Sequence, residues 1–196
     1  PAVIFTIVSS TLTAYGFGRF KFFGRSVLFA ILMSTLFLPQ VVLNVPQYIM
    51  YNIFGWVGSK LYLPLIVPSM FATETYFVFM LIQFLRNIPK ELEEAAKIDG
   101  CNEIQTLIKV IVPMLKPALV SCALFKFMWA SNDFLGPLLY VNNPAKYPAT
   151  IFVKLAMDSD AGFAWNRILS TSLISILPSI IIFFIAQNQF VEGISA

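Results

Sequence analysis

Histidine is absent from this 196-residue chain, and cysteine occurs only twice, as Cys101 and Cys122. The lack of histidine removes the commonest general base and the commonest metal ligand of proteins. One cysteine falls in a polar segment and the other in an apolar one, so we expect neither a disulfide nor a metal-ligand pair. The sequence therefore predicts a protein that is not an enzyme and that holds no metal or other cofactor of its own.

Charged residues are also scarce, at 12% of the chain, whereas 58% of the residues are hydrophobic. Soluble domains carry roughly 25% charged residues, and so few polar residues could not cover an apolar core of this size. The lipid bilayer is the natural solvent for the excess. The net charge of +3 is not gathered into a basic run, so nucleic-acid binding is not expected.

Long uncharged segments indicate where the chain crosses the bilayer, because a spanning helix needs about 20 mostly apolar residues. We predict about five spans, over residues 1–18, 26–42, 62–85, 118–139 and 168–187. An interfacial stretch with Tyr48, Tyr51 and Trp56 follows the second span, since such side chains favour the headgroup level. Backbone groups must be satisfied in lipid and no barrel pattern occurs, so the expected fold is an all-α, polytopic transmembrane helix bundle forming one domain, residues 1–196.

Lysine and arginine in short loops set the orientation of such a bundle. Arg19, Lys21 and Arg25 lie between the first two spans without an acidic residue, so this loop should be cytoplasmic. Alternation then places residues 43–61 and 140–166 outside, and residues 86–117 and the C-terminus inside.

Residues 86–116 hold ten of the 23 charged residues and form the one segment that reads like soluble protein. Asn87 and Pro89 suit the start of a helix, and Gly100 suits its left-handed end. Small apolar residues on one face of this helix could sit deep in a groove of a second protein: Leu92, Ala95 and Ala96. On charge pattern alone, a solvated connector is an equally good interpretation.

A second helix is predicted after Gly100, with Asn102 as its cap. Its apolar residues repeat at helical spacing: Ile104, Leu107, Ile108 and Ile111. Pro113 and Pro117 then break or bend the chain before the fourth span.

This polar segment also carries a recognisable motif. Residues 94–100 read Glu-Ala-Ala-Lys-Ile-Asp-Gly, and nine residues later come Val110-Ile111-Val112-Pro113 and then Pro117. The pattern resembles the EAA loop of the permeases of binding-protein-dependent ABC importers, which prefer Ile and Leu where Val110 and Val112 stand.

Further segments resemble the carbohydrate-importer branch of that family, close to the smaller permeases of maltose and glycerol-phosphate importers. These segments are residues 12–20, 88–94, 132–134 with 137–138, and 177–194. The family usually has Trp before Asn132, where this chain has Ser131. The resemblance implies a core of six spans, so we expect the first span and a few C-terminal residues to be missing here.

The resemblance implies a permease subunit of an ATP-driven importer, for sugars or oligosaccharides, in the bacterial plasma (inner) membrane. Its implied partners are a second permease subunit, an ATPase dimer that binds ATP and Mg²⁺, an external substrate-binding protein and the sugar itself. ATPase closure would drive alternating access through the cytoplasmic EAA loop at about residues 87–117. The chain has no phosphate-binding loop of its own, because five residues separate Gly18 from Gly24 and Arg25 follows, where such a loop needs four and then Lys.

The resemblance assigns the ATPase-coupling role to one set of residues: Glu94, Ala95, Ala96, Asp99, Gly100, Pro113 and Pro117. Glu94 and Asp99 would make polar contacts to the ATPase, the two alanines would give the close face, and Gly100 the turn.

Charges inside the predicted spans are the second signal. Lys126 and Asp133 are seven residues apart, so we expect them to share a helix face, and each is costly in lipid unless it faces a cavity or a partner. With Asn132 and Glu74 they are candidates for the transport pathway or for subunit pairing. For Glu74, structural pairing is a better interpretation than contact with the substrate. Lys126 and Asp133 could instead reach water at the span ends.

Three alternatives remain open at this point. An importer of another small solute fits the same motif, and an ion-coupled carrier or channel would explain the spans but not the loop. An intramembrane hydrolase is disfavoured because no histidine exists to activate a serine. The outer segment 140–166 either contacts the binding protein or is a plain surface loop.

Overall fold

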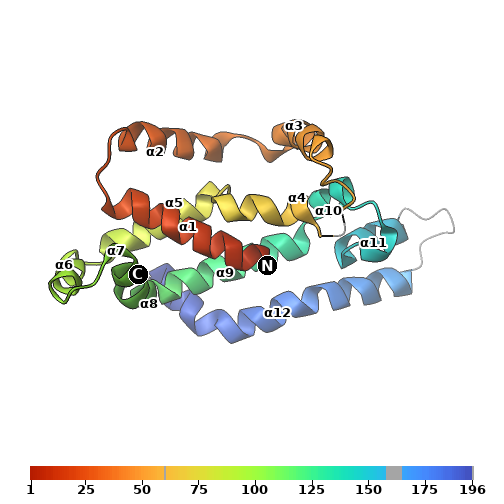
Figure 1. The fold of residues 1–196 in the computed structure, drawn as a ribbon. Helices are drawn as coiled ribbons and strands as arrows, with labels where there is room; N and C mark the ends of the chain where they lie inside the picture. Colours follow the sequence, from red (N-terminus) through yellow and green to blue (C-terminus); the bar gives the residue numbers. More distant parts are fainter. Residues whose placement is uncertain (60, 158–164, 196) are drawn as a thin grey trace.

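The structure, a computed structural model, describes residues 1–59, 61–157 and 165–195, and every regular element within these ranges is helical. The bundle is built from four helices: α1 (Ala2–Arg19), α5 (Thr75–Asn87), α9 (Lys116–Asn132) and α12 (Trp165–Ser195). They pack in the order α5, α1, α9, α12, with α5 also touching α9 (Figure 1). The all-α prediction is therefore confirmed.

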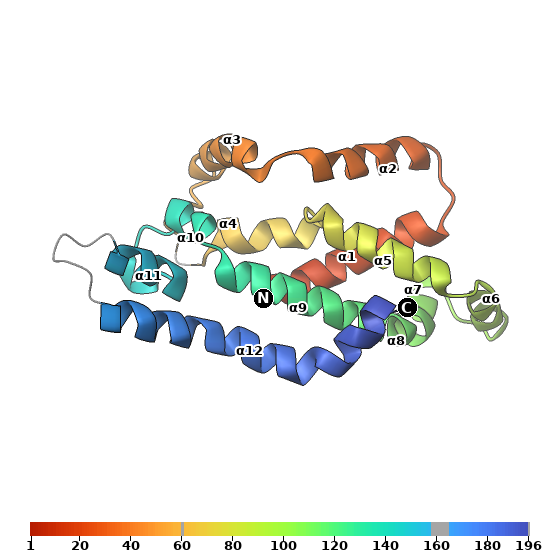
Figure 2. The same ribbon diagram turned by 180° about the vertical axis from the view of Figure 1, so that it is seen from behind.

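Shorter elements gather beside the bundle and at its two ends. α2 (Arg25–Ser34), η1 (Thr35–Phe37) and α3 (Gln40–Ile53) form an arm alongside it, and α4 (Leu63–Ile66) and η2 (Val67–Phe71) lead into α5. One end carries α10 (Leu135–Tyr140), η4 (Pro144–Lys146) and α11 (Ala149–Met157). The opposite end carries α6 (Glu91–Ile98), α7 (Glu103–Thr106), the π-helical turn η3 (Leu107–Ile111) and α8 (Val112–Met114) (Figure 2).

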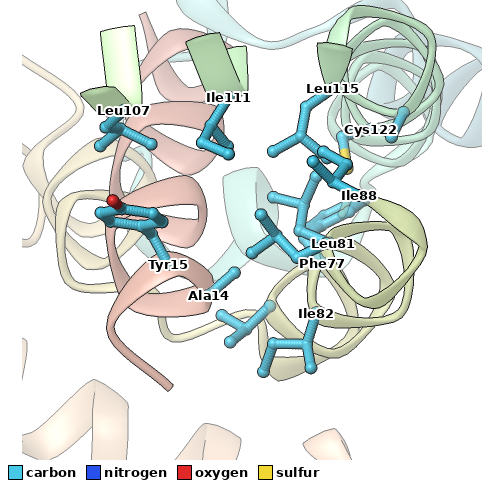
Figure 3. Packing of buried hydrophobic residues seen from close by; sticks show 13 residues of the cluster. Ala14, Tyr15, Phe77, Leu81, Ile82, Ile88, Leu107, Ile111, Leu115 and Cys122 are labelled. Carbon is cyan, nitrogen blue, oxygen red and sulfur yellow. The ribbon is translucent and has the colours of Figure 1, made fainter. Parts of the chain in front are cut away.

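The apolar core lies where α5 meets α1 and the segment from η3 to α9. Phe77, Leu81 and Leu85 of α5 are almost fully buried and pack in one cluster with Ala14 of α1 and Ile111 of η3 (Figure 3). This core lies towards the α6 end of the bundle, so the helices that bear the polar segment are fixed to it.

α1 buries a polar stripe and exposes an apolar one. Thr6 and Ser10 are buried and lie four residues apart, whereas Ile4, Val8 and Leu12 are each more than half exposed. A soluble helix would show the reverse pattern, because water favours polar side chains outside. The arrangement suits a helix whose outer face meets lipid.

Two helical segments in the described ranges are long and apolar enough to cross a membrane, Leu63–Asn87 and Trp165–Gln187. The number rises to four if two bent pairs each count as one span: Arg25–Phe37 with Gln40–Ile53, bent by 103°, and Glu103–Met114 with Lys116–Asn132, bent by 78°. The third and fifth predicted spans coincide with these two candidates. The first coincides with α1 but is not among these candidates, because its five Ser and Thr residues and Arg19 make it less apolar, so the number of about five stays a prediction.

The helices of two predicted spans end earlier than predicted. The second, 26–42, is interrupted because the helix stops at Phe37 and the chain bends sharply at Pro39. The fourth, 118–139, stops at Asn132, since Pro137 has no N–H for the carbonyl of Asp133. That carbonyl instead accepts a hydrogen bond from the Thr150 hydroxyl at 3.1 Å. The expectation that Lys126 and Asp133 share a helix face is therefore wrong.

Candidate functional site

α6 stands apart from the bundle at one end of the molecule (Figure 1). It begins at Glu91 with Lys90 as its N-cap, so the expectation that Asn87 or Pro89 starts it is wrong: Asn87 is the last residue of α5. The three acidic residues of its first turn face the positive end of the helix dipole. The helix is thus stabilised by its own sequence as well as by packing.

The end of α6 is a Schellman motif, as the left-handed stop at Gly100 predicts. Gly100 has φ +81° and donates its N–H to the Lys97 carbonyl at 3.0 Å, while Cys101 donates to the Ala96 carbonyl at 2.9 Å. A Cβ at Gly100 would meet no atom within 4 Å, so backbone conformation alone requires glycine here.

The second helix of the loop has the predicted cap and an unpredicted bulge. Asn102 and Gln105 form a reciprocal capping box, with N–H to side-chain oxygen distances of 2.8 and 2.9 Å. The helix then widens into the π turn η3, because Pro113 has no N–H for the carbonyl four residues before it. Pro117 lies in the first turn of α9, after the 78° bend.

Four exposed residues of α6 and the exposed residue that follows it define what we call the coupling face: Leu92, Glu94, Ala95, Ile98 and Asp99. Ile98 is 87% exposed, and the acidic residues Glu94 and Asp99 are exposed on the same face. Ala96, which we expected to face a second protein together with Leu92 and Ala95, is instead buried against its own chain.

The second helix likewise splits its predicted apolar face. Leu107 and Ile111 are buried in the core, whereas Ile104 and Ile108 are 69% and 60% exposed. The inner stripe is continued by Leu115, which is also buried. Pro113 is exposed and Pro117 is partly buried.

A polar contact that the sequence reasoning missed anchors α6 to the bundle. Glu93 points inward and pairs with the Arg19 guanidinium of α1 at 2.5 Å, with side-chain exposures of 10% and 7%. Arg19 also donates to the Ile88 carbonyl, at the end of α5, at 2.7 Å. The sequence held two signals for this contact. Glu93 lies three residues before Ala96, so the two share one side of the helix. Arg19 ends a predicted span and has no acidic residue nearby in the sequence.

Charge shapes this end of the molecule. Burial raises the pKa of the Glu93 carboxyl above its ordinary value, although Arg19 and Lys97 oppose the change. Lys97 forms an exposed ion pair with Glu103 at 2.7 Å, and the hydrogen bond to Glu103 raises the pKa of Lys97. The exposed charges of α6 and the inward pair at Glu93 therefore differ in environment, because only the latter is shielded from water.

The charged residues inside the bundle form a second polar centre. Lys126 of α9 pairs with Glu74, which caps α5, and Thr6 of α1 donates to the other Glu74 oxygen at 3.4 Å. The expected structural pairing of Glu74 thus has a partner within this chain. Asp133 lies elsewhere: its side chain accepts the Gly136 N–H at 3.0 Å at the start of α10.

Asn132 is exposed and lines two adjoining grooves. The larger, about 470 Å³, lies between α9 and α12 and is lined chiefly by Met128, Ile176, Ser179 and Phe183. The other adds Thr150, Ser172 and Ser175. Among the residues that the structure describes, no cluster of acidic, Cys or His side chains is arranged to hold a metal ion.

Comparison with known proteins assigns this architecture to a family. A model of the family described as "Binding-protein-dependent transport system inner membrane component" matches residues 6–193. The trehalose/maltose transport system permease protein MalG of Thermococcus litoralis is 30% identical over 191 residues, which cover 97% of this chain and 68% of that protein. The osmoprotective compounds uptake permease protein GgtD of Synechocystis is 33% identical, over 100% of this chain and 65% of that protein.

Among solved structures, the fold is shared by a bacterial ABC transporter involved in the import of the acidic polysaccharide alginate. It matches with a TM-score of 0.76 at 22% identity, over 96% of this chain and 71% of that one. The family match spans nearly the whole chain and the helices superpose over the same extent. The chain therefore belongs to the binding-protein-dependent inner-membrane permeases of ABC importers, and it is a multi-pass component of a transporter complex without catalytic activity or a cofactor of its own.

Proposed function

We propose that this permease imports sugars or oligosaccharides, and that α6 is the element on which an ATPase subunit acts. The observation that carries the proposal is the coupling face. An apolar side chain as large as Ile98, exposed between Glu94 and Asp99 on a helix that stands outside the bundle, suits a groove in a second protein. The chain's own EAA motif occupies the same residues.

The orientation follows from charge. α1 ends at Arg19, which contacts Glu93 of α6, so this end of α1 lies with α6 at one end of the molecule, and the C-terminal end of α12 lies there too (Figures 1 and 2). Eight of the 13 Lys and Arg residues belong to this end: Arg19, Lys21, Arg25, Arg86, Lys90, Lys97, Lys109 and Lys116. The positive-inside rule makes it cytoplasmic, where an ATPase dimer would reach α6. A second permease subunit and an external binding protein complete the proposed complex.

The substrate class rests on relatives and on one groove. MalG carries trehalose and maltose in its name, and the α9–α12 groove combines the amide of Asn132 and the hydroxyl of Ser179 with the ring of Phe183. Aromatic faces beside hydrogen-bonding groups suit a sugar. A different small solute is the second candidate, because GgtD is named for osmoprotective compounds. Asn132 is the proposed pathway residue, while Lys126 and Glu74 are proposed to hold the helices around it.

Two substitutions test the docking role. Gly100→Asp forces a side chain into the left-handed region, at about 1–2 kcal/mol, and Glu94→Lys reverses an exposed charge on the coupling face. Both should abolish uptake and release the ATPase from the purified permease, while membrane insertion stays normal. Lys21→Glu, an exposed reversal at the same end but off α6, is the matched control and should transport normally. Normal uptake with ATPase still bound in both α6 variants would refute the docking role.

A further inference from the structure

The end of α1 holds the coupling helix through one buried side chain. The Arg19 guanidinium contacts the Glu93 carboxylate of α6 at 2.5 Å and the Ile88 carbonyl, between α5 and α6, at 2.7 Å. Both partners flank the start of α6, so a single planar cation fixes the angle at which that helix leaves the bundle. Arginine suits this task because its fork of donors can engage two acceptors at once.

A second contact joins the same face of α1 to the other side of the loop. Tyr15, one turn before Arg19, donates its hydroxyl to Glu103 at 3.4 Å, and Glu103 pairs with Lys97 of α6. Residues four apart lie on one helix face. α1 therefore touches α6 through Arg19 and the start of α7 through Tyr15, on both sides of the Gly100 turn.

The far part of α1 reaches the polar centre of the bundle. Thr6 donates to Glu74, the partner of Lys126, and Ser9 donates to the Ser69 carbonyl at 2.8 Å. At 1.5 Å per residue, the 13 residues from Thr6 to Arg19 span roughly 20 Å. Between these two ends α1 packs along α5 closely: a Cβ on Gly18 would lie 3.2 Å from the Leu85 side chain.

From these contacts we infer that Arg19 is a positioning residue, which ties α6 to α1 so that the two helices move together and α1 carries the displacement of the coupling helix to the Glu74–Lys126 pair. The inference rests on the proposed docking of an ATPase on α6. The coupling face would receive the displacement, and the inward face, through Glu93, would pass it on. Exposed Glu94 and buried Glu93 then serve opposite sides of the same helix.

The test measures coupling separately from docking. In vesicles with the complete complex, Arg19→Gln and Glu93→Gln should leave the ATPase bound to the permease and hydrolysing ATP. Substrate uptake should fall by roughly 5–150-fold, the usual range for lost coupling between sites. The number of ATP molecules hydrolysed per substrate should rise in proportion. The exchanged pair, Arg19→Glu with Glu93→Arg, should recover part of the uptake.

Matched controls separate this role from simple loss of charge. Arg86→Gln removes an exposed arginine at the end of α5, and Glu91→Gln removes an exposed acid from α6 itself. Both should keep the normal ratio of ATP to substrate. If Arg19→Gln does not reach the membrane, Glu93→Gln, which keeps the side-chain shape, decides the question.

Two results would overturn the inference. One is an unchanged ratio of ATP hydrolysed to substrate moved in the variants that insert. The other is an equal loss of hydrolysis and uptake, which would mean a structural role only. Release of the ATPase by Glu93→Gln would count against the separation of the two faces, whereas retention of the ATPase by Glu94→Lys would count against the docking role.

Discussion

Replacing Lys126 with methionine would remove the cation from the polar centre while keeping a long apolar side chain. Lys126 and Glu74 have side-chain exposures of 11% and 28%, so the carboxylate that is left behind would be largely shielded from water. In the described structure it would keep only the Thr6 hydroxyl at 3.4 Å. The variant therefore tests whether this pair stabilises the helix bundle.

The expected magnitude follows from burial. Breaking a buried ion pair by removing one partner costs about 3–5 kcal/mol. We take the lower value because the Glu74 side chain is 28% exposed. For a chain of this length 1 kcal/mol lowers Tm by roughly 2–4 °C, so a fall of about 6–12 °C is expected. Adding Glu74→Gln removes the second charge, and most of the lost stability should return, since an uncharged replacement of a buried pair is often neutral.

Thermal unfolding of the purified protein in detergent, followed by tryptophan fluorescence, measures both effects. Lys109→Met, at an exposed lysine of the polar loop, is the control and should change stability by less than about 0.5 kcal/mol. A Tm for Lys126→Met within about 2 °C of the parent, or a double variant no more stable than the single one, would refute the reasoning.

Two further predictions concern the polar loop. Asn102→Ala removes one half of the capping box and should destabilise the start of α7 by about 1 kcal/mol. Asn102→Asp keeps the acceptor and should not. Hydrogen exchange of the Gln105 amide measures both variants, and equal protection of that amide in the two would contradict the capping role. Because burial raises the pKa of Glu93, the folded chain binds this proton more tightly than the unfolded one, so acidification adds to folding stability but neutralises the partner of Arg19. Uptake per ATP should therefore fall as pH drops towards that raised pKa, in a window above the ordinary glutamate range, and Glu93→Gln should show no such dependence. Three cations oppose this pKa shift and one acid adds to it: Arg19, Lys97 and Lys90, and Glu103.

The local features of the loop could be predicted because they depend on neighbouring residues only. A helix stop at Gly100 and a cap at Asn102 are decided by backbone groups within a few positions. The break after Asn132 could have been predicted in the same way from Pro137, which leaves the Asp133 carbonyl without its helical donor. The apolar composition of residues 118–139 predicts one long span, whereas the proline within it ends the helix earlier.

Which side each helix shows to its neighbours could not be predicted from periodicity. Ala95 and Ala96 look equivalent in sequence, yet one is exposed and the other buried. The same holds for Glu94 and Glu93. Adjacent residues lie about 100° apart round a helix, so a modest rotation of α6 decides which of them faces a partner protein and which faces α1.

The sequence by itself determined that the chain lies in the lipid bilayer, that it is helical and where its polar loop falls. It could do so because hydrophobic content and capping residues act locally. Only the tertiary structure decided the partners of the buried charges. Glu74 finds Lys126, 52 positions away, and Arg19 at the end of α1 finds Glu93 in α6, 74 positions away. An ion pair between helices depends on their rotation and register, and these are fixed by packing in the core rather than by any one segment.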